Sequence, residues 1–404
     1  MKKKYVMWIL SICMVATMSA PILSLAATTD SVNTETSTTQ SATTGSAITQ
    51  TETTETAIKL ERVNLSLDGA YKKLEDSKTM EMIKLKKQSD ESVAKGYSEM
   101  SSSYSKMEKS DALISGYDSS NKLVAQERRD FANLMLESNN QARVNAMKQQ
   151  TFQKYYTIRN TETQVQIAKD SLQLKKNFLE TTKRKYQVGA ASKSEVDNAE
   201  KEVKNAETQF EATENNLKQL KLNFNSYLGY DIAQEVVLTD DIQEIELPKT
   251  TLTDAIALAL KTRNEVKEAA YSVKISQLNF NSYKAYPTSS SKYINARTQL
   301  LNAEIANENK PTDIELDIRT KYDSMMDAYN SVQTGKSTLK SAEDTVNTTT
   351  RKYKLGMVTS SEVQQAQLAL NNAKLSQANA LLSYKLAVEN YNLSMGVGTV
   401  AVNL

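Results

Sequence analysis

The feature that most constrains the fold of this 404-residue chain is an internal duplication. The segment TTKRKYQVGAASKSEVDNAEKEVKNAE (181–207) recurs without a gap as TTTRKYKLGMVTSSEVQQAQLALNNAK (348–374). The same offset joins Gly229, at the end of LNFNSYLG, to Gly396, at the end of ENYNLSMG. A repeat that holds one register over this distance indicates two copies of one structural unit.

A weaker match marks the beginning of each copy. LSLDGAYKKL, from Leu65, resembles TLTDAIALAL, from Thr251. The sequence therefore predicts six segments: a signal peptide (1–26), a disordered Thr/Ser-rich tether (27–62), a first helical repeat (63–230), a connector (231–250), a second helical repeat (251–398) and a tail (399–404).

The N-terminus carries an export signal. Three Lys residues (2–4) precede the apolar run Tyr5–Leu25, and Ala26 ends a small-residue cleavage site. We therefore expect an exported protein of the cell envelope, extracytoplasmic and membrane-associated, and in an outer membrane only if the organism has one. The apolar run is also nearly long enough for an uncleaved anchor. The polar segment that follows has too few apolar residues to fold and predicts a tether.

Both repeats have the pattern of long helices. The chain contains only 10 Gly and 4 Pro, well below average usage, which disfavours turn-rich β folds. Apolar residues alternate at spacings of 3 and 4 after each repeated turn, as in a coiled coil. In the first copy these are Val196, Ala199, Val203, Ala206, Phe210, Thr213, Leu217, Leu220, Phe224 and Tyr227. In the second copy the same positions have smaller and more polar occupants, namely Val363, Ala366, Leu370, Ala373, Gln377, Ala380, Tyr384, Ala387, Tyr391 and Ser394.

The repeated segment itself predicts a tight turn between two antiparallel helices. Gly189 and Gly356 follow helix ends rich in Arg and Lys, as expected of a left-handed C-cap glycine. Ser192 with Glu195, and Thr359 with Glu362, have the spacing of a capping box at the start of the next helix. Turn chemistry alone accounts for these polar residues and glycines.

Turn chemistry does not account for the apolar residues in both turns. Exposed apolar groups at the end of a long helical hairpin indicate a docking surface. We therefore predict that the two tips bind a partner through Val188, Gly189, Ala190, Ala191, Ser192, Leu355, Gly356, Met357, Val358 and Thr359.

No catalytic, metal or cofactor site is predicted. The chain has no His, which excludes Ser-His-Asp sites and histidine-ligated zinc motifs. Its 50 Lys and Arg against 48 Asp and Glu give no basic excess for nucleic acid. We expect a protein that is not an enzyme and that uses no cofactor.

These features resemble the TolC family of outer-membrane efflux proteins. The resemblance rests on the openings of the repeats (65–68 and 252–255) and on the tip motifs, namely Tyr186, Gly189, Ser192, Glu195 and Val196, and Tyr353, Gly356, Thr359, Glu362 and Val363. It implies an all-α protomer of two tandem helical hairpins that forms part of a hollow trimeric α-barrel. It also implies that the tips meet a membrane-fusion or adaptor protein, which links the duct to an ABC- or RND-type exporter.

The chain departs from the family where two membrane strands enter each repeat. Such strands need alternating apolar and polar residues. The corresponding segments, 101–122 and 285–310, are polar and do not alternate. We therefore expect a TolC-like α-barrel protomer without a transmembrane β-barrel.

Two functions follow from this pattern. The first is an envelope efflux or export component that docks an adaptor through its tips. The alternative is a structural or adhesive coiled-coil spacer of the envelope with no transport role. Paired apolar tips favour docking, and the missing strands favour the spacer.

Overall fold

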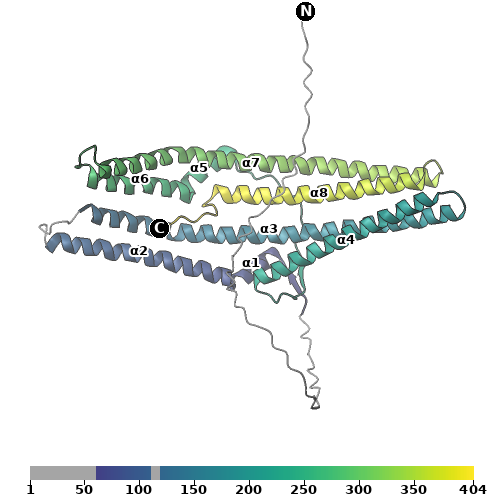
Figure 1. Ribbon diagram of the computed structural model, residues 1–404, viewed down its shortest axis with the longest axis horizontal. Helices are drawn as coiled ribbons and strands as arrows, with labels where there is room; N and C mark the ends of the chain where they lie inside the picture. Colours follow the sequence, from purple (N-terminus) through teal and green to yellow (C-terminus); the bar gives the residue numbers. More distant parts are fainter. Residues whose placement is uncertain (1–60, 111–118) are drawn as a thin grey trace, which may run out of the picture. The chain divides into compact units, whose positions relative to one another are not determined.

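The computed structural model describes residues 61–110 and 119–404, so the predicted signal peptide and nearly all of the tether lie outside the described residues. The described chain is almost entirely helical (Figure 1). Its elements, in order, are β1 (Val63–Leu65), α1 (Leu67–Glu75), α2 (Lys78–Ser110), α3 (Ser119–Gln187), α4 (Lys193–Leu228), β2 (Val236–Leu238), α5 (Leu252–Thr262), α6 (Asn264–Tyr283), α7 (Ser291–Lys354) and α8 (Ser360–Met395).

The same order of helices occurs twice. In each half a short helix (α1 or α5) precedes a longer one (α2 or α6), and a very long helix (α3 or α7) then turns into the last one (α4 or α8). Helix α3 contacts α2, α4, α6 and α8, and α7 contacts α6 and α8. The long helices therefore lie side by side, with α2 and α4 at one edge and α7 at the other (Figure 1).

Helix continues through much of the two segments where the resemblance led us to look for strands. Helix α2 runs to Ser110, and α7 begins at Ser291 and continues through Pro311. Pro311 is exposed, so water can hydrogen-bond the carbonyl that it leaves without an intrahelical donor. No helix among residues 61–110 and 119–404 combines the length and apolar character needed to cross a membrane.

The predicted apolar seams face the neighbouring long helices. In α4, Val196, Ala199 and Val203 near the tip and Phe224 near the other end are buried, and the seam positions between them are half-buried. In α8, Tyr384 and Tyr391 are fully buried against α7, where they contact Tyr329 and Tyr322. Each long helix is thus stabilised mainly by packing against its hairpin partner.

A two-stranded parallel sheet, which the sequence pattern did not reveal, ties the connector to the start of the first repeat. Strand β1 pairs with β2 in the register Val63 with Val236 and Leu65 with Leu238. The buried hydroxyl of Tyr155 in α3 donates to the Leu65 carbonyl at 2.9 Å. The same hydroxyl accepts from the backbone amides of Thr239 and Asp240. One α3 side chain therefore fixes both strands.

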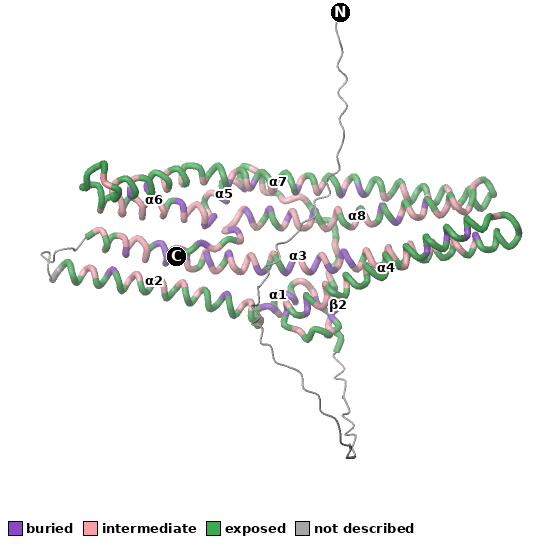
Figure 2. Tube along the Cα trace, in the orientation of Figure 1, coloured by how far each residue is buried: buried purple, intermediate pink, exposed green. Residues whose placement is uncertain are grey.

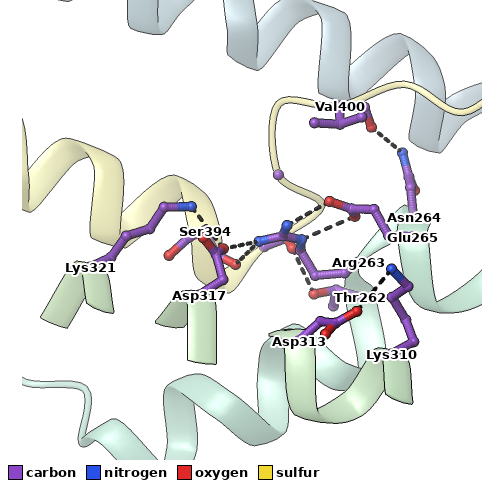
Figure 3. A network of polar contacts seen from close by, with 12 residues as sticks. Thr262, Arg263, Asn264, Glu265, Lys310, Asp313, Asp317, Lys321, Ser394 and Val400 are labelled. Carbon is purple, nitrogen blue, oxygen red and sulfur yellow. Dashed lines mark hydrogen bonds and ion pairs between the residues drawn. The ribbon is translucent and has the colours of Figure 1, made fainter. Parts of the chain in front are cut away.

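A buried arginine marks the break between α5 and α6 (Figure 3). The guanidinium of Arg263 pairs with Glu265 at 2.5 Å and with Asp317 of α7 at 3.0 Å. It also donates to the backbone carbonyl of Ser394 near the end of α8. Burial acts to raise the pKa of Asp317, but hydrogen bonds and charges from Lys321 and Arg263 outweigh it and lower that pKa.

The chain after α8 lies between the two halves. The Asn139 side chain of α3 donates to the Val402 carbonyl and accepts from the Val402 amide, both at 2.9 Å. Asn264 of α6 donates to the Val400 carbonyl. Gly396 is not left-handed, unlike Gly229, and the left-handed residue here is Gly398, with φ +82°. The predicted tail thus contacts both repeats.

Candidate functional site: the hairpin tips

The first tip connects α3 to α4 through a glycine-centred helix end. Gly189 has φ +75°, and its amide donates to the Tyr186 carbonyl at 3.0 Å. The Ala190 amide donates to the Lys185 carbonyl at 2.7 Å. This pair of bonds is a Schellman motif, which satisfies carbonyls that the end of a helix otherwise leaves free.

The second tip connects α7 to α8 in the same way. Gly356 has φ +71°, and its amide donates to the Tyr353 carbonyl at 2.9 Å. The Met357 amide donates to the Lys352 carbonyl at 2.9 Å. The two tips therefore share one backbone geometry with different side chains, Ala190 in the first and Met357 in the second.

A capping box begins the helix after each tip. The Ser192 hydroxyl accepts from the Glu195 amide at 3.2 Å, and the Glu195 carboxylate accepts from the Ser192 amide at 2.6 Å. Thr359 and Glu362 repeat this exchange at 3.3 Å and 2.7 Å. The backbone hydrogen bond from residue 192 or 359 is the main cause that lowers the pKa of Glu195 and of Glu362.

The turns at both tips are exposed to solvent (Figure 2). Val188 is 79% exposed, Leu355 74% and Met357 71%. Ala190 is also exposed, and Ala191 and Val358 are half-buried. Because the Schellman motif fixes the backbone, these side chains stand on a rigid turn.

The two tips lie close to each other. The Lys185 ammonium lies 3.5 Å from the Ser360 hydroxyl, which joins the end of α3 to the start of α8. A groove of about 190 Å³ lies beside this contact, lined by α3 residues such as Phe178 and by Tyr353 and Val363 of the second hairpin. The ten predicted tip residues thus form one end of the hairpin pair.

The charge of the tips was not part of the sequence prediction. Between Glu180 and Glu195 the only charged residues are Lys183, Arg184, Lys185 and Lys193, and between Asp344 and Glu362 they are Arg351, Lys352 and Lys354. The sequence pattern assigned the arginines and lysines only to the helix ends. The paired tips form a basic rim around exposed apolar side chains, in which Lys183 and Arg184 pair with Glu200 and Glu180. Among residues 61–110 and 119–404 no cluster of potential metal ligands occurs.

Structural comparison finds a similar helical fold in several outer-membrane proteins. CusC, described as forming a transmembrane channel, superposes with a TM-score of 0.62 at 13% identity over 82% of this chain and 92% of CusC. The outer membrane protein VceC from Vibrio cholerae gives 0.58 at 12% identity over 83% and 97% of the two chains. The open state of the Neisseria gonorrhoeae MtrE outer membrane channel gives 0.55 at 10% identity over 82% and 89%.

No protein-family model matches the sequence, and no curated protein matches it. The likeness is therefore one of fold. The chain has the helical fold of TolC-type outer-membrane efflux channels, as the tip motifs predicted. These neighbours are channels and not enzymes, in agreement with the expectation of a non-catalytic protein.

Proposed function

We propose that the protein is a TolC-like component of an envelope efflux or export system that docks an adaptor protein through its hairpin tips. The observation that carries the proposal is the pair of rigid, basic tips that expose Val188, Leu355 and Met357. A helical spacer has no need of two matched apolar tips. The fold shared with outer-membrane channels supports the transport role.

The proposal includes assembly into a ring, for which the resemblance implies a trimer. Helix α2 exposes Met82, Leu85 and Met100 at one edge. Helix α7 exposes Leu301, Ile305 and Leu316 at the other. Different edges that contact each other head to tail generate a closed ring when the rotation closes.

Charges on the two edges support the same contact. The α2 edge carries exposed Lys84 and Lys86 beside Leu85. The α7 edge carries exposed Glu308 and Asp313 between Ile305 and Leu316, and Asp313 also pairs with Lys310 at 3.3 Å. Opposite charges around an apolar contact orient association and disfavour pairing of two identical edges.

Photocrosslinking in cells tests tip docking directly. A photoreactive amino acid replaces Ala190 at the first tip, and a matched variant carries it at the exposed Lys204 of α4. We expect Ala190 to yield an adduct with a membrane-fusion protein or exporter subunit, which mass spectrometry identifies, and Lys204 to yield none. The proposed partner is an adaptor that serves an ABC- or RND-type exporter.

The same experiment separates the alternative function. Adducts only to the chain itself or to cell-wall material, equal at Ala190 and Lys204, would make the protein a structural or adhesive spacer of the envelope. That outcome would leave the fold unchanged and remove the transport role.

A further inference from the structure

The turn between α6 and α7 differs in charge from the rest of the chain. No Asp or Glu occurs between Glu268 and Glu304. The cations of this stretch are Lys274, Lys284, Lys292 and Arg297. Lys274 pairs with Glu127 at 3.0 Å, whereas the other three have no ion pair with a described carboxylate. The turn therefore carries uncompensated positive charge.

Aromatic side chains accompany these cations. Tyr283 and Tyr286 lie with ring centroids 5.8 Å apart, and the Lys292 ammonium lies 5.1 Å from the Tyr286 centroid. Phe280 contacts Tyr293 edge to face at 5.4 Å. The Arg297 guanidinium lies 5.7 Å from the Phe280 centroid. The turn thus presents two groups, and in each a cation lies near an aromatic ring: Lys292 near Tyr286 and Arg297 near Phe280.

The group formed by Tyr283, Tyr286 and Lys292 faces solvent. Tyr283 is 37% exposed and Tyr286 42%, and Lys284 and Lys292 are also exposed. Ile294, in the first turn of α7, is 49% exposed. Large rings with a polar tip, beside lysines, are the combination that binds at the headgroup level of a bilayer.

The described ends of α2 and α3 at this end of the molecule lack the charge pattern. The end of α2 and the start of α3 carry acidic and basic residues together, and Lys122 there pairs with Glu108 at 2.6 Å. Charge compensation inside the protein leaves no attraction for a distant anionic surface. Among the described residues at this end, the cations without an ion pair that lie beside exposed tyrosines are those of the α6–α7 turn.

We propose that the α6–α7 turn binds an anionic lipid surface, with Lys284 and Lys292 at the phosphates and Tyr283 and Tyr286 at the interface. In this contact the turn lies at the surface of the bilayer and does not cross it. An anionic wall polymer offers phosphates but no apolar layer for the tyrosines, so lipid fits the observed surface better. The turn and the second tip occupy opposite ends of α7, so this proposal does not depend on tip docking.

The test uses the full chain with a single tryptophan reporter. Trp8→Phe removes the only native tryptophan, and Tyr286→Trp places the reporter at the turn. We expect phosphatidylglycerol vesicles, and not phosphatidylcholine vesicles, to shift its emission to shorter wavelength, and brominated lipid to quench it. A reporter at the exposed Ile232 controls for vesicle contact elsewhere on the chain.

Charge reversal gives the matched comparison. Each lysine near an anionic surface contributes roughly fivefold in affinity, so Lys284→Glu with Lys292→Glu should weaken the response of the tryptophan reporter at the turn by roughly 30-fold or more. Lys201→Glu with Lys204→Glu changes net charge equally at exposed sites on α4 and should leave the response unchanged. Equal responses to both lipids, equal loss in both double variants, or a response to soluble poly(glycerol phosphate) without lipid would each overturn the proposal.

Discussion

Gly335 of α7 lies directly against the side chain of Gln377 of α8, at the middle of the second hairpin. A Cβ at position 335 would overlap the Gln377 amide oxygen and come within 3.6 Å of the Gln377 Cα. Both residues are buried, and that amide oxygen has no hydrogen-bond partner among the described residues. The absence of a side chain at 335 thus lets a polar seam residue fit between two long helices.

A larger residue at 335 should therefore destabilise the hairpin. We expect Gly335→Leu to lower the free energy of unfolding by about 1–3 kcal/mol, because a buried side chain added to a packed site forces its neighbours apart. Combining it with Gln377→Ala, which removes the side chain in the way, should recover much of the loss. Urea unfolding of the single and double variants measures both effects.

Gly96 of α2 supplies the control for this prediction. A Cβ there meets nothing within 4 Å. Gly96→Ala should raise stability by about 0.5–1 kcal/mol, the usual difference between glycine and alanine in a helix. An unchanged stability of Gly335→Leu would show that α7 and α8 do not approach as described.

The pairing of Arg263 with Asp317 predicts a dependence of stability on acid. Because the folded-state pKa of Asp317 is lowered, its stabilisation is complete above the unfolded-state value near 3.8 and is lost as pH falls through the lower folded-state pKa. Arg263→Met leaves Glu265 and Asp317 without their shared cation and should cost on the order of 3 kcal/mol at pH 7.

Unfolding in urea at pH 7 and at several values below pH 4 checks whether stability falls on acidification. The parent should lose more stability on acidification than Arg263→Met, since protonation of Asp317 matters less once the guanidinium is gone. Lys321 keeps part of the effect, because its ammonium lies 2.8 Å from Asp317. A parallel loss in both proteins would contradict the role given to Arg263.

Local chemistry and long-range packing were not equally predictable. The tip geometry depends on residues within one turn of each other, so Gly189 and Ser192 could be placed from spacing alone. The contact of Gly335 with Gln377 and the burial of Arg263 depend on residues far apart in the chain. A single sequence carries no signal for such pairs.

The strands and the helix limits also depend on long-range packing and could not be predicted from local sequence. Strand β1 is only three residues long, too short for periodicity to distinguish, and its partner β2 lies in a segment that the sequence predicts as a connector. Helix α3 already includes Ser119, well before Phe131, where the apolar pattern becomes clear, because polar residues extend a helix once its neighbours support it.

The N-cap residues of the tips should determine the local stability of α4 and α8. Ser192→Ala and Thr359→Ala should each cost about 1 kcal/mol, because the first amides of the helix lose their acceptor. Ser192→Asp keeps an acceptor and should cost little. Amide hydrogen exchange at residues 193–197 should rise in the alanine variant and stay near the parent in the aspartate variant. Similar exchange in all three would contradict the capping role.

The edge contact proposed for the ring can be broken by one charge. Leu316 is 64% exposed on α7, and Leu316→Asp should disrupt oligomers while circular dichroism stays unchanged. Ile232→Asp, at a site 58% exposed on the connector, is the matched control and should leave the oligomer intact. Native mass spectrometry gives the subunit number directly. Loss of the oligomer in both variants would show a general solubility effect and not an edge contact.

The side chain of Met357 should decide partner capture at the second tip. It stands 71% exposed on a turn whose backbone bonds do not involve its side chain, so Met357→Asp should leave helix content unchanged. The new carboxylate places a solvated charge in the apolar contact and also neutralises part of the basic rim formed by Lys352 and Lys354. We expect crosslinking to the partner to fall at least tenfold, a loss that corresponds to about 1.4 kcal/mol. Met357→Leu keeps an apolar side chain and should retain capture. If the aspartate and leucine variants capture the partner equally, this tip does not dock through Met357, and docking would have to rely on Val188 and Ala190 of the first tip.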